Sequence, residues 1–569
     1  MLRMTLHAPD LIRRPVRTAS GWTFGRSVIE PFAHNALHAE CIASAKRTLI
    51  SVRERMRGES VNLERIGLVS ERALDDHLRA LRQRPLDFNY VEVVHEGDSA
   101  GVRLGCGRWG SAPIYLLARN GVLHAHWDIA ALYEALPNAK LDPAFAAKYL
   151  VELDHPYSRR TIFPDIHMLT ERSVARIGPT LERIAIRYPS AERHAEARRL
   201  KPGARVTAAF KDILQSAMHM RILSDEQIVA LELSGGLDST LVAASAASLR
   251  GPGVRSYGMI MPGPDGEWQR RRRDDTVRRF GLIDRSFPAA TQPPFGPTSA
   301  RVRTDGMIPF GEFYDEAVGH LMDLARADGV DTIFTGMGGD ELCSLQWGEV
   351  DGGPEASDCD EMPDDSMDID SNCRDDTREV ADSHEPAAPT LTRYADDAYH
   401  EGVDDLDPAP EPLLYRSALE SAAAVSALYL RKGIWPVSPL CTPELVEFCR
   451  RLPFLWREDR TVHRKVLASY GCPRLITRPT HLETFLGVMH KALSQDAAPR
   501  LRDLFAEPRL ADQGLVDAAR LRELYGQFRQ GDRRYEDQIL AAAMLELTVR
   551  SVESRIASRR PDAQRAARR

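Results

Sequence analysis

Residues 234–239, Ser-Gly-Gly-Leu-Asp-Ser, combine hydroxyl groups, adjacent glycines and a carboxylate in a very short stretch. Apolar residues precede this stretch and an alanine-rich sequence follows it, which predicts a strand, a loop and a helix. At such a junction the free backbone N–H groups and the helix dipole favour an anion. Gly235 and Gly236 allow the backbone to approach a ligand closely, and Ser234 and Ser239 supply hydroxyl donors. We therefore expect a phosphate group to bind here.

A carboxylate in the same loop, Asp238, would repel a bare phosphate. A Mg²⁺ ion between the two groups would remove that repulsion, because carboxylate and phosphate oxygens are ligands that Mg²⁺ prefers. The loop lacks the lysine of the GxxxxGK[ST] motif, so another type of nucleotide loop is indicated. The alternative is a tight structural turn in which Asp238 only caps the following helix.

The elements that must position this loop alternate along the second part of the chain. Strand patterns are predicted at 228–233, 254–261 and 331–336, and helical patterns from 239, at 268–280 and at 312–327. Such βαβ alternation predicts a parallel sheet with helices on its faces. The chain after residue 411 is predicted to be mainly helical.

The first part of the chain is rich in short β patterns separated by turns. The step Arg119-Asn120-Gly121 between two apolar runs predicts a β-hairpin. The KPGA sequence at 201–204 interrupts this pattern, and helical periodicity begins at Val206. We expect a β-rich domain at 1–195 and an α/β domain at 203–569.

Charge is distributed unevenly along the chain. The net charge is −7, but residues 349–411 alone contain 22 acidic residues and three arginines. The rest of the chain therefore has 60 acidic and 72 basic residues and is mildly cationic. The composition of 349–411 predicts a disordered insertion. A solvated surface loop is the simplest interpretation, and a gate over a site or a surface for a basic partner is the alternative.

Composition also bears on location and redox state. No stretch reaches the roughly 18 apolar residues that a membrane span needs, and the N-terminus lacks the apolar segment of a secretory signal. We expect a cytoplasmic protein. The eight cysteines form neither a CxxC pair nor a zinc-type spacing, so we expect reduced and mostly buried thiols.

Two segments together resemble a known family. SGGLDS is similar to the pyrophosphate-binding loop of the ATP pyrophosphatases, which split ATP into AMP and pyrophosphate. The sequence DTIFTGMGGDELCS at 331–344 resembles the second nucleotide motif of their asparagine-synthetase branch. The resemblance implies ATP and Mg²⁺ as cofactors. It assigns Mg²⁺ to Asp238 and Asp340, pyrophosphate to Ser234, Gly235, Gly236 and Ser239, and the nucleoside to Leu233, Met259 and Gly336.

The resemblance covers most of the chain. Segments 107–136 and 161–177 resemble the last part of a class II glutaminase domain, and segments 438–453, 464–471 and 475–485 resemble the helical part of a synthetase domain. The implied α/β fold joins a degenerate Ntn-amidotransferase-like, β-rich domain of αββα type to a parallel-sheet ATP-pyrophosphatase (PP-loop) domain with a helical C-terminal part.

The N-terminal sequence departs from the family pattern. Glutamine-using members carry, directly after the initiator methionine, a cysteine that attacks glutamine. Here Met1 is followed by Leu2 and Arg3, and the first cysteine is Cys41. We therefore expect a glutaminase-like domain without its nucleophile, and a nitrogen source other than glutamine.

The synthetase part departs from the pattern at two positions. Met337 stands where asparagine synthetases carry a glutamate, and Thr480 stands where they carry a lysine thought to assist amine attack. His481 or Lys465 could take over that catalytic task, since histidine suits acid–base work near neutral pH. The alternative for His481 is a structural role at the surface.

The sequence motif TGMGGDE and the degenerate N-terminal domain resemble those of the lasso peptide macrolactam synthetases, or lasso cyclases. This resemblance implies adenylation of an Asp or Glu side chain in a ribosomal precursor peptide, followed by attack of the peptide's N-terminal amine. A leader-binding protein and a leader peptidase are implied as partners, and no nucleic-acid partner is expected. The alternatives are a glutamine-independent asparagine synthetase, a β-lactam-synthetase-like ligase acting on a small molecule, and a non-catalytic scaffold that binds the precursor peptide.

Overall fold

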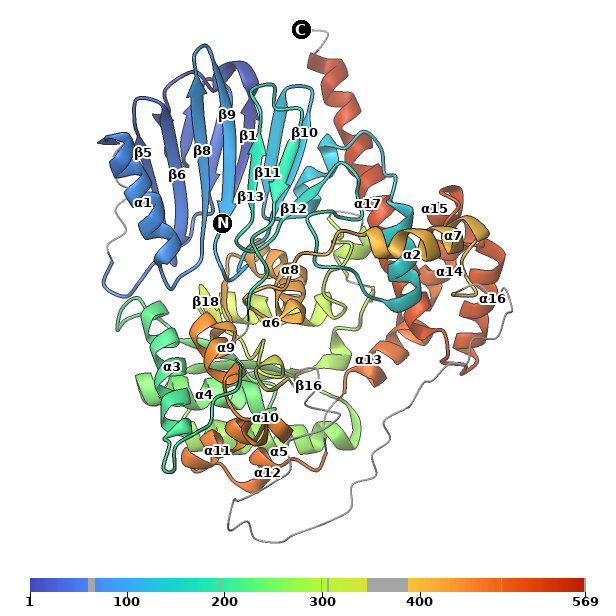
Figure 1. The fold of residues 1–569 in the computed structure, drawn as a ribbon. Coiled ribbons are helices and arrows are strands. Elements are labelled where there is room, and N and C mark those ends of the chain that lie inside the picture. The colour runs from blue at the N-terminus through green and yellow to red at the C-terminus, as the bar shows by residue number, and fades with distance from the viewer. Residues whose placement is uncertain are drawn as a thin grey trace.

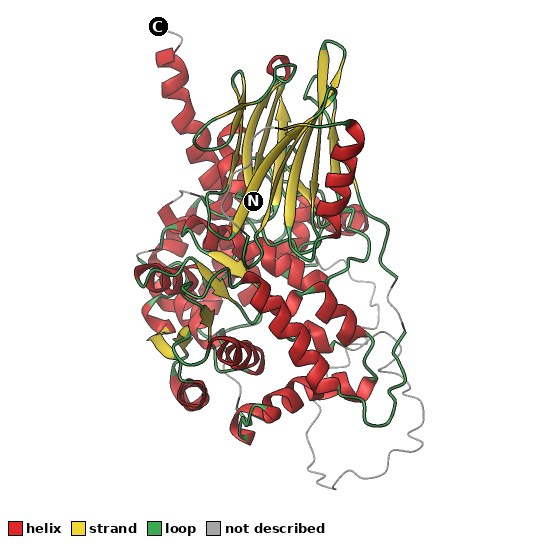
Figure 2. Ribbon diagram, turned by 90° about the vertical axis from the view of Figure 1, so that its left-hand side faces the viewer, coloured by secondary structure: helices red, strands yellow, loops and turns green. Residues whose placement is uncertain are grey.

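The computed structural model describes residues 1–59, 67–193, 196–297, 299–303, 306–344, 387–481 and 484–566. A region of antiparallel sheets lies above a region built from a parallel sheet and many helices (Figure 1). The shorter strands of the parallel sheet are surrounded by helices (Figure 2). The predicted mixed α/β fold class, with antiparallel sheets first and a parallel sheet second, is confirmed.

The first region consists of two sheets whose apolar faces share one core. Leu6 and Leu116 on the first sheet belong to the same buried cluster as Val52 and Val91 on the second. The order of the first sheet is β12 (His167–Leu169), β10 (Ile114–Arg119), β11 (Val122–His126), β1 (Leu2–His7), β4 (Ser27–Pro31), β3 (Trp22–Phe24) and β2 (Val16–Arg17). The order of the second is β14 (Ile184–Arg187), β13 (Val174–Ile177), β9 (Ser99–Cys106), β8 (Phe88–Glu96), β6 (Arg47–Glu54), β5 (Leu37–Ala43) and β7 (Gly67–Leu68).

The predicted hairpin is confirmed. Strands β10 and β11 pair in antiparallel register, and Arg119 lies opposite Val122. Asn120 and Gly121 between them have φ angles of +53° and +71°. Glycine and asparagine tolerate this left-handed backbone, which matches the twist of the flanking strands.

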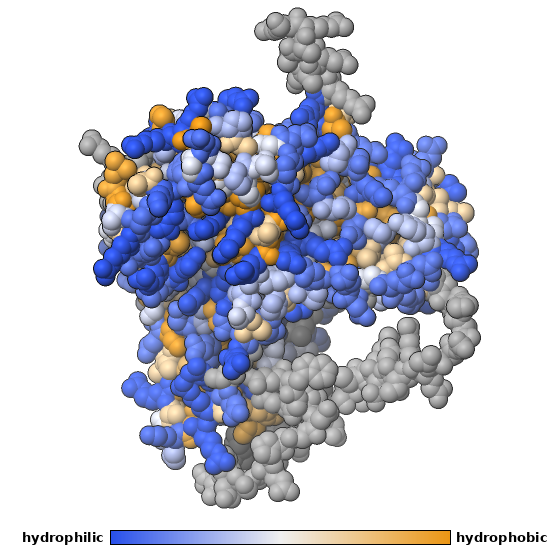
Figure 3. Space-filling view, turned by 45° about the horizontal axis from the view of Figure 1, so that its top comes forward, coloured by the Kyte–Doolittle hydropathy of each residue, from blue (hydrophilic) through white to orange (hydrophobic). Residues whose placement is uncertain are grey.

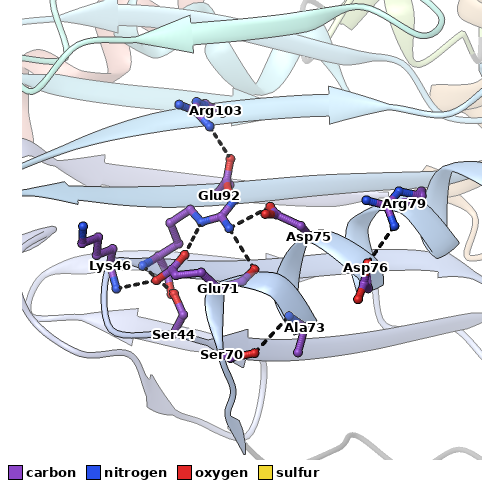
Figure 4. Close-up of polar contacts among 11 residues, drawn as sticks. Ser44, Lys46, Ser70, Glu71, Ala73, Asp75, Asp76, Arg79, Glu92 and Arg103 are labelled. Carbon is purple, nitrogen blue, oxygen red and sulfur yellow. Dashed lines mark hydrogen bonds and ion pairs between the residues drawn. The ribbon is translucent and has the colours of Figure 1, made fainter.

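Helix α1 (Glu71–Gln83) covers the outer face of the second sheet. Ser70 Oγ caps it by accepting from Ala73 N at 3.2 Å, and leucines at helical spacing pack against the sheet. Arg47 on β6 fastens the helix by ion pairs to Glu71 at 2.8 Å and Asp75 at 2.7 Å, and it also pairs with Glu92 on β8 (Figure 4).

The second region contains a parallel sheet of order β17 (Ile283–Pro288), β16 (Arg255–Ile260), β15 (Ala230–Glu232), β18 (Thr332–Phe334) and β19 (Trp435–Val437). Helices α3 (Val206–Arg221), α4 (Leu237–Arg250) and α5 (Gly263–Phe280) lie on one side, and α6 (Asp315–Ala327) and α8 (Arg416–Arg431) on the other. The strands and helices that the sequence predicted here are confirmed within a few residues. Strands β17 and β19 were not predicted, because both are edge strands that contain proline, and β17 is also polar.

The C-terminal part is helical, as predicted. Its helices are α9 (Pro443–Arg450), α10 (Phe454–Arg457), α11 (Thr461–Ser469), α12 (Arg474–Thr477), α13 (Leu486–Lys491), α14 (Ala498–Ala506), α15 (Arg509–Asp512), α16 (Ala518–Arg529) and α17 (Glu536–Ala566). Helix α17 runs from this part to the side of the antiparallel sheets (Figure 1). None of the helices within the described ranges is long and apolar enough to cross a membrane.

The prediction of a disordered insertion at 349–411 is wrong for residues 387–411. Helix α7 (Arg393–Gly402) lies there and packs on α2 (Pro143–Glu152) of the first region, where Tyr399 Oη donates to Glu152 Oε1 at 2.9 Å. Ala395 is fully buried while Asp397 and Glu401 of α7 are exposed, so a high negative charge did not prevent packing. Residues 345–386, which include the rest of the predicted insertion, lie outside the described residues.

The two regions share a hydrophobic core and a buried ion pair. Arg221 on α3 donates to Glu54 on β6 at 2.8 Å, and both side chains are 3% exposed. Trp435 Nε1 on β19 donates to the same carboxylate at 3.1 Å, and the Arg221 guanidinium lies 4.2 Å from the Trp109 ring centre. The surface itself is mostly hydrophilic, with only scattered apolar patches on the face shown in Figure 3.

Six cysteines lie within the described residues, and all are free thiols. Five are buried and Cys106 is half-buried, which confirms the predicted pattern for these positions. Cys359 and Cys373 lie outside the described residues.

Candidate nucleotide site at the edge of the parallel sheet

The SGGLDS loop joins the central strand of the parallel sheet to a helix. Strand β15 ends at Glu232 and α4 begins at Leu237, so the predicted strand, loop and helix are present. Gly235 has φ +92°, and a Cβ there would lie 2.9 Å from Arg273 Cγ. Only glycine fits this position without strain. Ser234 Oγ accepts from Gly236 N at 3.1 Å and lies 3.0 Å from Ser239 Oγ, so the two hydroxyls fix the curvature of the loop.

Two buried side chains of α5 support the loop from behind. Gln269 Nε2 donates to the carbonyl oxygens of Ser234 and Met259, both at 3.0 Å, and ties the ends of β15 and β16 together. Arg272 Nε donates to Gly235 O at 3.0 Å. Both side chains are 1% exposed. The sequence analysis missed them because they lie in a polar run in which buried and exposed residues look alike.

The second glycine-rich turn, which follows β18, packs directly on the first loop. A Cβ on Gly336 would lie 3.0 Å from Ser239 N, and a Cβ on Gly339 would lie 2.2 Å from Asp238 Cγ. Glycine is required at both positions because any larger residue would push the two motifs apart. The structure thus brings together the two segments on which the resemblance rests.

The carboxylates of Asp238 and Asp340 converge on one cationic group. Arg460 Nη1 lies 3.2 Å from Asp238 Oδ2, and Arg460 Nη2 pairs with Asp340 Oδ1. Asp238 Oδ1 is buried and has no hydrogen-bond partner within the described ranges. The pKa of Asp238 is raised to about 6, mainly by burial; Arg460 lowers it and Glu341 contributes to the rise. A pair of oxygen donors, one with an unpartnered buried oxygen, fits a hard divalent cation such as Mg²⁺.

A buried histidine that the sequence analysis did not single out contacts the same carboxylate. His463 is fully buried, and its Nδ1 lies 3.5 Å from Asp238 Oδ1. The pKa of His463 is lowered to about 3, mainly by burial and also by the charges of Arg460 and Arg464. The imidazole is therefore neutral, so it leaves the charge of Asp238 available to a metal.

The two motifs border a cavity of about 810 Å³. Six of the predicted site residues line it: Ser234, Gly236, Asp238, Ser239, Gly336 and Asp340. Gly235 forms the turn behind them. Leu233 is fully buried, and Met259 is a half-buried residue of β16, so these two predicted nucleoside contacts do not reach the cavity wall.

The two residues proposed to replace the family lysine lie elsewhere. Lys465 Nζ sits over the Trp456 ring at 4.4 Å, and His481 stacks on Trp268 with ring centres 5.1 Å apart. Neither lines the cavity, and neither does Thr480. The family position occupied by Met337 does line it, so an apolar thioether replaces a carboxylate there.

The cavity is also lined by four arginines that the sequence did not predict: Arg272, Arg457, Arg460 and Arg464. Asp459 and Arg460 have left-handed φ angles of +47° and +53°, and this backbone turn directs Arg460 at the carboxylates. The spacing RxxRxxxR from 457 to 464 was the sequence signal that could have indicated these arginines. Arginines around a phosphate-binding loop supply charge-assisted donors to a triphosphate.

The described thiols of the first region are not nucleophiles. Burial raises the pKa of Cys41 to about 12 and raises that of Cys106 still further. Both remain protonated at neutral pH, whereas the thiolate is the reactive form.

A glycine loop at the end of a parallel strand, with a second glycine turn that delivers a carboxylate, defines an α/β nucleotide-binding protein. The sequence profile of the asparagine synthase family matches residues 209–550, which is more than half of the chain. The chain belongs to the asparagine synthase family, and membership indicates an ATP-dependent ligase that forms amide bonds. Among curated proteins, none matches the chain.

Arg460→Met should increase the affinity of the nucleotide-free protein for Mg²⁺. The variant removes the cation that pairs with both carboxylates, so Mg²⁺ no longer competes with it. We expect a gain of about tenfold, equivalent to ~1.4 kcal/mol, measured by titration calorimetry with MgCl₂. Lys465→Met makes the same charge change one helical turn away and should leave the affinity unchanged. An unchanged affinity in Arg460→Met would show that Asp238 and Asp340 do not bind the ion together.

Proposed function

We propose that this protein forms a macrolactam in a ribosomal precursor peptide, as lasso cyclases do. It adenylates an Asp or Glu side chain of the peptide, and the peptide's own N-terminal amine then attacks the activated carbonyl. The observation that carries the ATP-dependent half is the contact between the SGGLDS loop and the second glycine turn, which brings Asp238 and Asp340 to one cation. The peptide half rests on the resemblance in sequence.

The geometry supports chemistry at the α-phosphorus of ATP. The substrate carboxylate attacks this phosphorus, an acyl–O–P bond forms, and the bond to pyrophosphate breaks. In this proposal the hydroxyls of Ser234 and Ser239, the loop amides and the cavity arginines bind the departing pyrophosphate; their position around one cavity supports it. When bound, Mg²⁺ would be held by Asp238 and Asp340 and would neutralise charge on the phosphates.

Activation makes AMP the leaving group, so a weak nucleophile such as an amine can displace it. An amine in the same molecule makes this step unimolecular, with effective molarities that reach about 10⁵ M or more. A cavity of about 810 Å³ has room for the nucleotide together with part of a peptide. The protonated thiols of the first region also agree with a nitrogen source other than glutamine.

The test mixes the protein, MgATP and a synthetic leaderless peptide that carries a free N-terminal amine and an Asp or Glu side chain. We expect AMP, pyrophosphate and a peptide lighter by one molecule of water, detected by nucleotide chromatography and mass spectrometry. ADP and phosphate in place of AMP and pyrophosphate would contradict adenylation. AMP formation with aspartate and ammonium chloride, but not with peptide, would select the small-molecule synthetases. Peptide binding without any MgATP affinity would select the scaffold.

A further inference from the structure

The strand that leads into the nucleotide loop ends in a carboxylate. Glu232 is the last residue of β15, and it lines the same cavity as Ser234 and Asp238. Ala230, two residues earlier, belongs to the buried cluster under α6 and α8. Because side chains alternate along a strand, Glu232 points to this same side, away from α4. Tyr429 Oη on α8 donates to Glu232 Oε1, and Tyr429 is 4% exposed.

Glu232 lacks a cationic partner in a cavity rich in arginine. In the part of the chain that the structure describes, the hydrogen bond from Tyr429 is the one polar contact of its carboxylate, and no Lys, Arg or His pairs with it. Arg460 pairs with Asp238 and Asp340, and Arg464 pairs with Asp459 at 2.7 Å. A second carboxylate, Glu312, adds negative potential. A ligand with a positive charge would therefore be stabilised beside Glu232.

The other carboxylates of the cavity either pair with an arginine or lie exposed at its rim. Asp238 and Asp340 face Arg460 and the predicted metal position. Glu458 and Asp459 are exposed residues at the rim. Glu232 is the cavity carboxylate that faces the α8 side, opposite the helix that follows the nucleotide loop. An amine bound there would lie on the α8 side of the cavity.

We propose that Glu232, oriented by Tyr429, binds the ammonium group of the attacking amine and accepts its proton. This inference rests on the proposed function and assigns a residue to its second step, the attack of the amine on the activated carbonyl. The Glu232 carboxylate removes one proton from the ammonium group, and the freed nitrogen lone pair forms the C–N bond. The acyl C–O bond to AMP then breaks, its electron pair leaves with the phosphate, and the second proton of the nitrogen leaves with AMP.

The acid–base behaviour of Glu232 agrees with this role. The pKa of Glu232 is raised to about 7, mainly by burial; the hydrogen bond from Tyr429 lowers it and the charge of Glu312 contributes to the rise. A carboxylate of this kind can hold or release a proton near neutral pH, which suits general base catalysis. Burial also raises the pKa of Glu312, which lies near Arg301.

The central experiment separates adenylation from amide formation in Glu232→Gln. With the same leaderless peptide and MgATP, we expect peptide-dependent exchange of pyrophosphate into ATP to stay within about twofold of the unmodified protein. Cyclised peptide should fall by about 10²-fold or more, the usual loss when a general base is removed. Hydroxylamine is largely unprotonated at neutral pH and needs no base, so it should trap the activated acid as a hydroxamate in the variant.

The pH profile of cyclisation provides a readout that a structural role would not move. In the unmodified protein the rate should rise with pH through about 7, where Glu232 loses its proton. Tyr429→Phe removes a donor to the carboxylate, so the rise should move to higher pH. Glu312→Gln removes a neighbouring negative charge, so the rise should move to lower pH while cyclisation is retained. Opposite shifts in these two variants would support the assignment.

Two results would overturn the assignment of Glu232 as the base for the amine. If Glu232→Gln loses pyrophosphate exchange as severely as cyclisation, Glu232 serves the nucleotide and not the amine. If Glu232→Gln cyclises peptide at the unmodified rate with an unchanged pH profile, it is not the base. A failure of the proposed function itself looks different, because the unmodified protein would then show no peptide-dependent pyrophosphate exchange.

Discussion

Asp238→Ala will abolish the formation of AMP from MgATP. The variant removes the buried carboxylate that faces the loop and the predicted metal position, and we expect the rate to fall by at least about 10²-fold to 10³-fold. Production of labelled AMP measures the effect. Glu341→Gln is the matched control, because Glu341 lies next to Asp340 but accepts from Ser417 Oγ at 3.0 Å outside the cavity. AMP formation at the normal rate in Asp238→Ala would make the metal assignment untenable.

Asp238→Ala should not unfold the protein. The pKa of Asp238 gives the sign of the expected change in the free energy of unfolding. Its folded pKa of about 6 lies above the ordinary aspartate value of 3.8. The folded state therefore holds a proton that the unfolded state has lost between these pH values, and stability from this group declines as pH rises through that window. Alanine removes this penalty, so at pH 7 the nucleotide-free variant should resist urea as well as the unmodified protein or better. A lower urea midpoint would attribute lost activity to misfolding.

Arg221→Met will lower the free energy of unfolding by about 3–5 kcal/mol. The substitution leaves the Glu54 carboxylate buried between the two regions without its cation, although Trp435 Nε1 still donates to it. Urea unfolding followed by tryptophan fluorescence measures the loss, since Trp109 and Trp435 report on this interface.

Arg57→Met tests whether burial causes the effect. Arg57 joins the same two regions through Ile222 O and Asp225, but Asp225 is 76% exposed. Water screens an exposed pair, so we expect a loss of only about 0–1 kcal/mol. Equal losses in Arg57→Met and Arg221→Met would argue against a special role for the buried pair.

The sequence predicted the central part of the second region well. Strand β15, the SGGLDS loop and α4 follow from an apolar run, adjacent glycines and an alanine-rich helix, all of them local signals. Edge strand β17 escaped prediction because it is polar and largely exposed, and β19 escaped because it is a three-residue edge strand with proline at its centre. Helix α7 escaped because its acidic composition conceals a single packed face around Ala395.

The structure brings the two predicted loops together, whereas several side chains that line the same cavity were not predicted. Glycines of both motifs could be identified because close backbone contact leaves no other residue type. Arg460 comes from a helix more than a hundred residues away from these motifs, and its meeting with Asp238 depends on a backbone turn that no local pattern indicates. Lys465 and His481 were chosen by neighbourhood in sequence, and aromatic stacking directs both away from the cavity.

The shared core has a consequence for the history of this chain. Side chains of the antiparallel sheets supply one wall of the packing around Trp435 and Arg221, so the synthetase part never forms a closed surface alone. The first region therefore contributes to the stability of the second, whatever chemistry it performs itself. Selection for stability would therefore act on the side chains buried between the two regions, such as Glu54, Arg221 and Trp435, and less on other residues of those sheets.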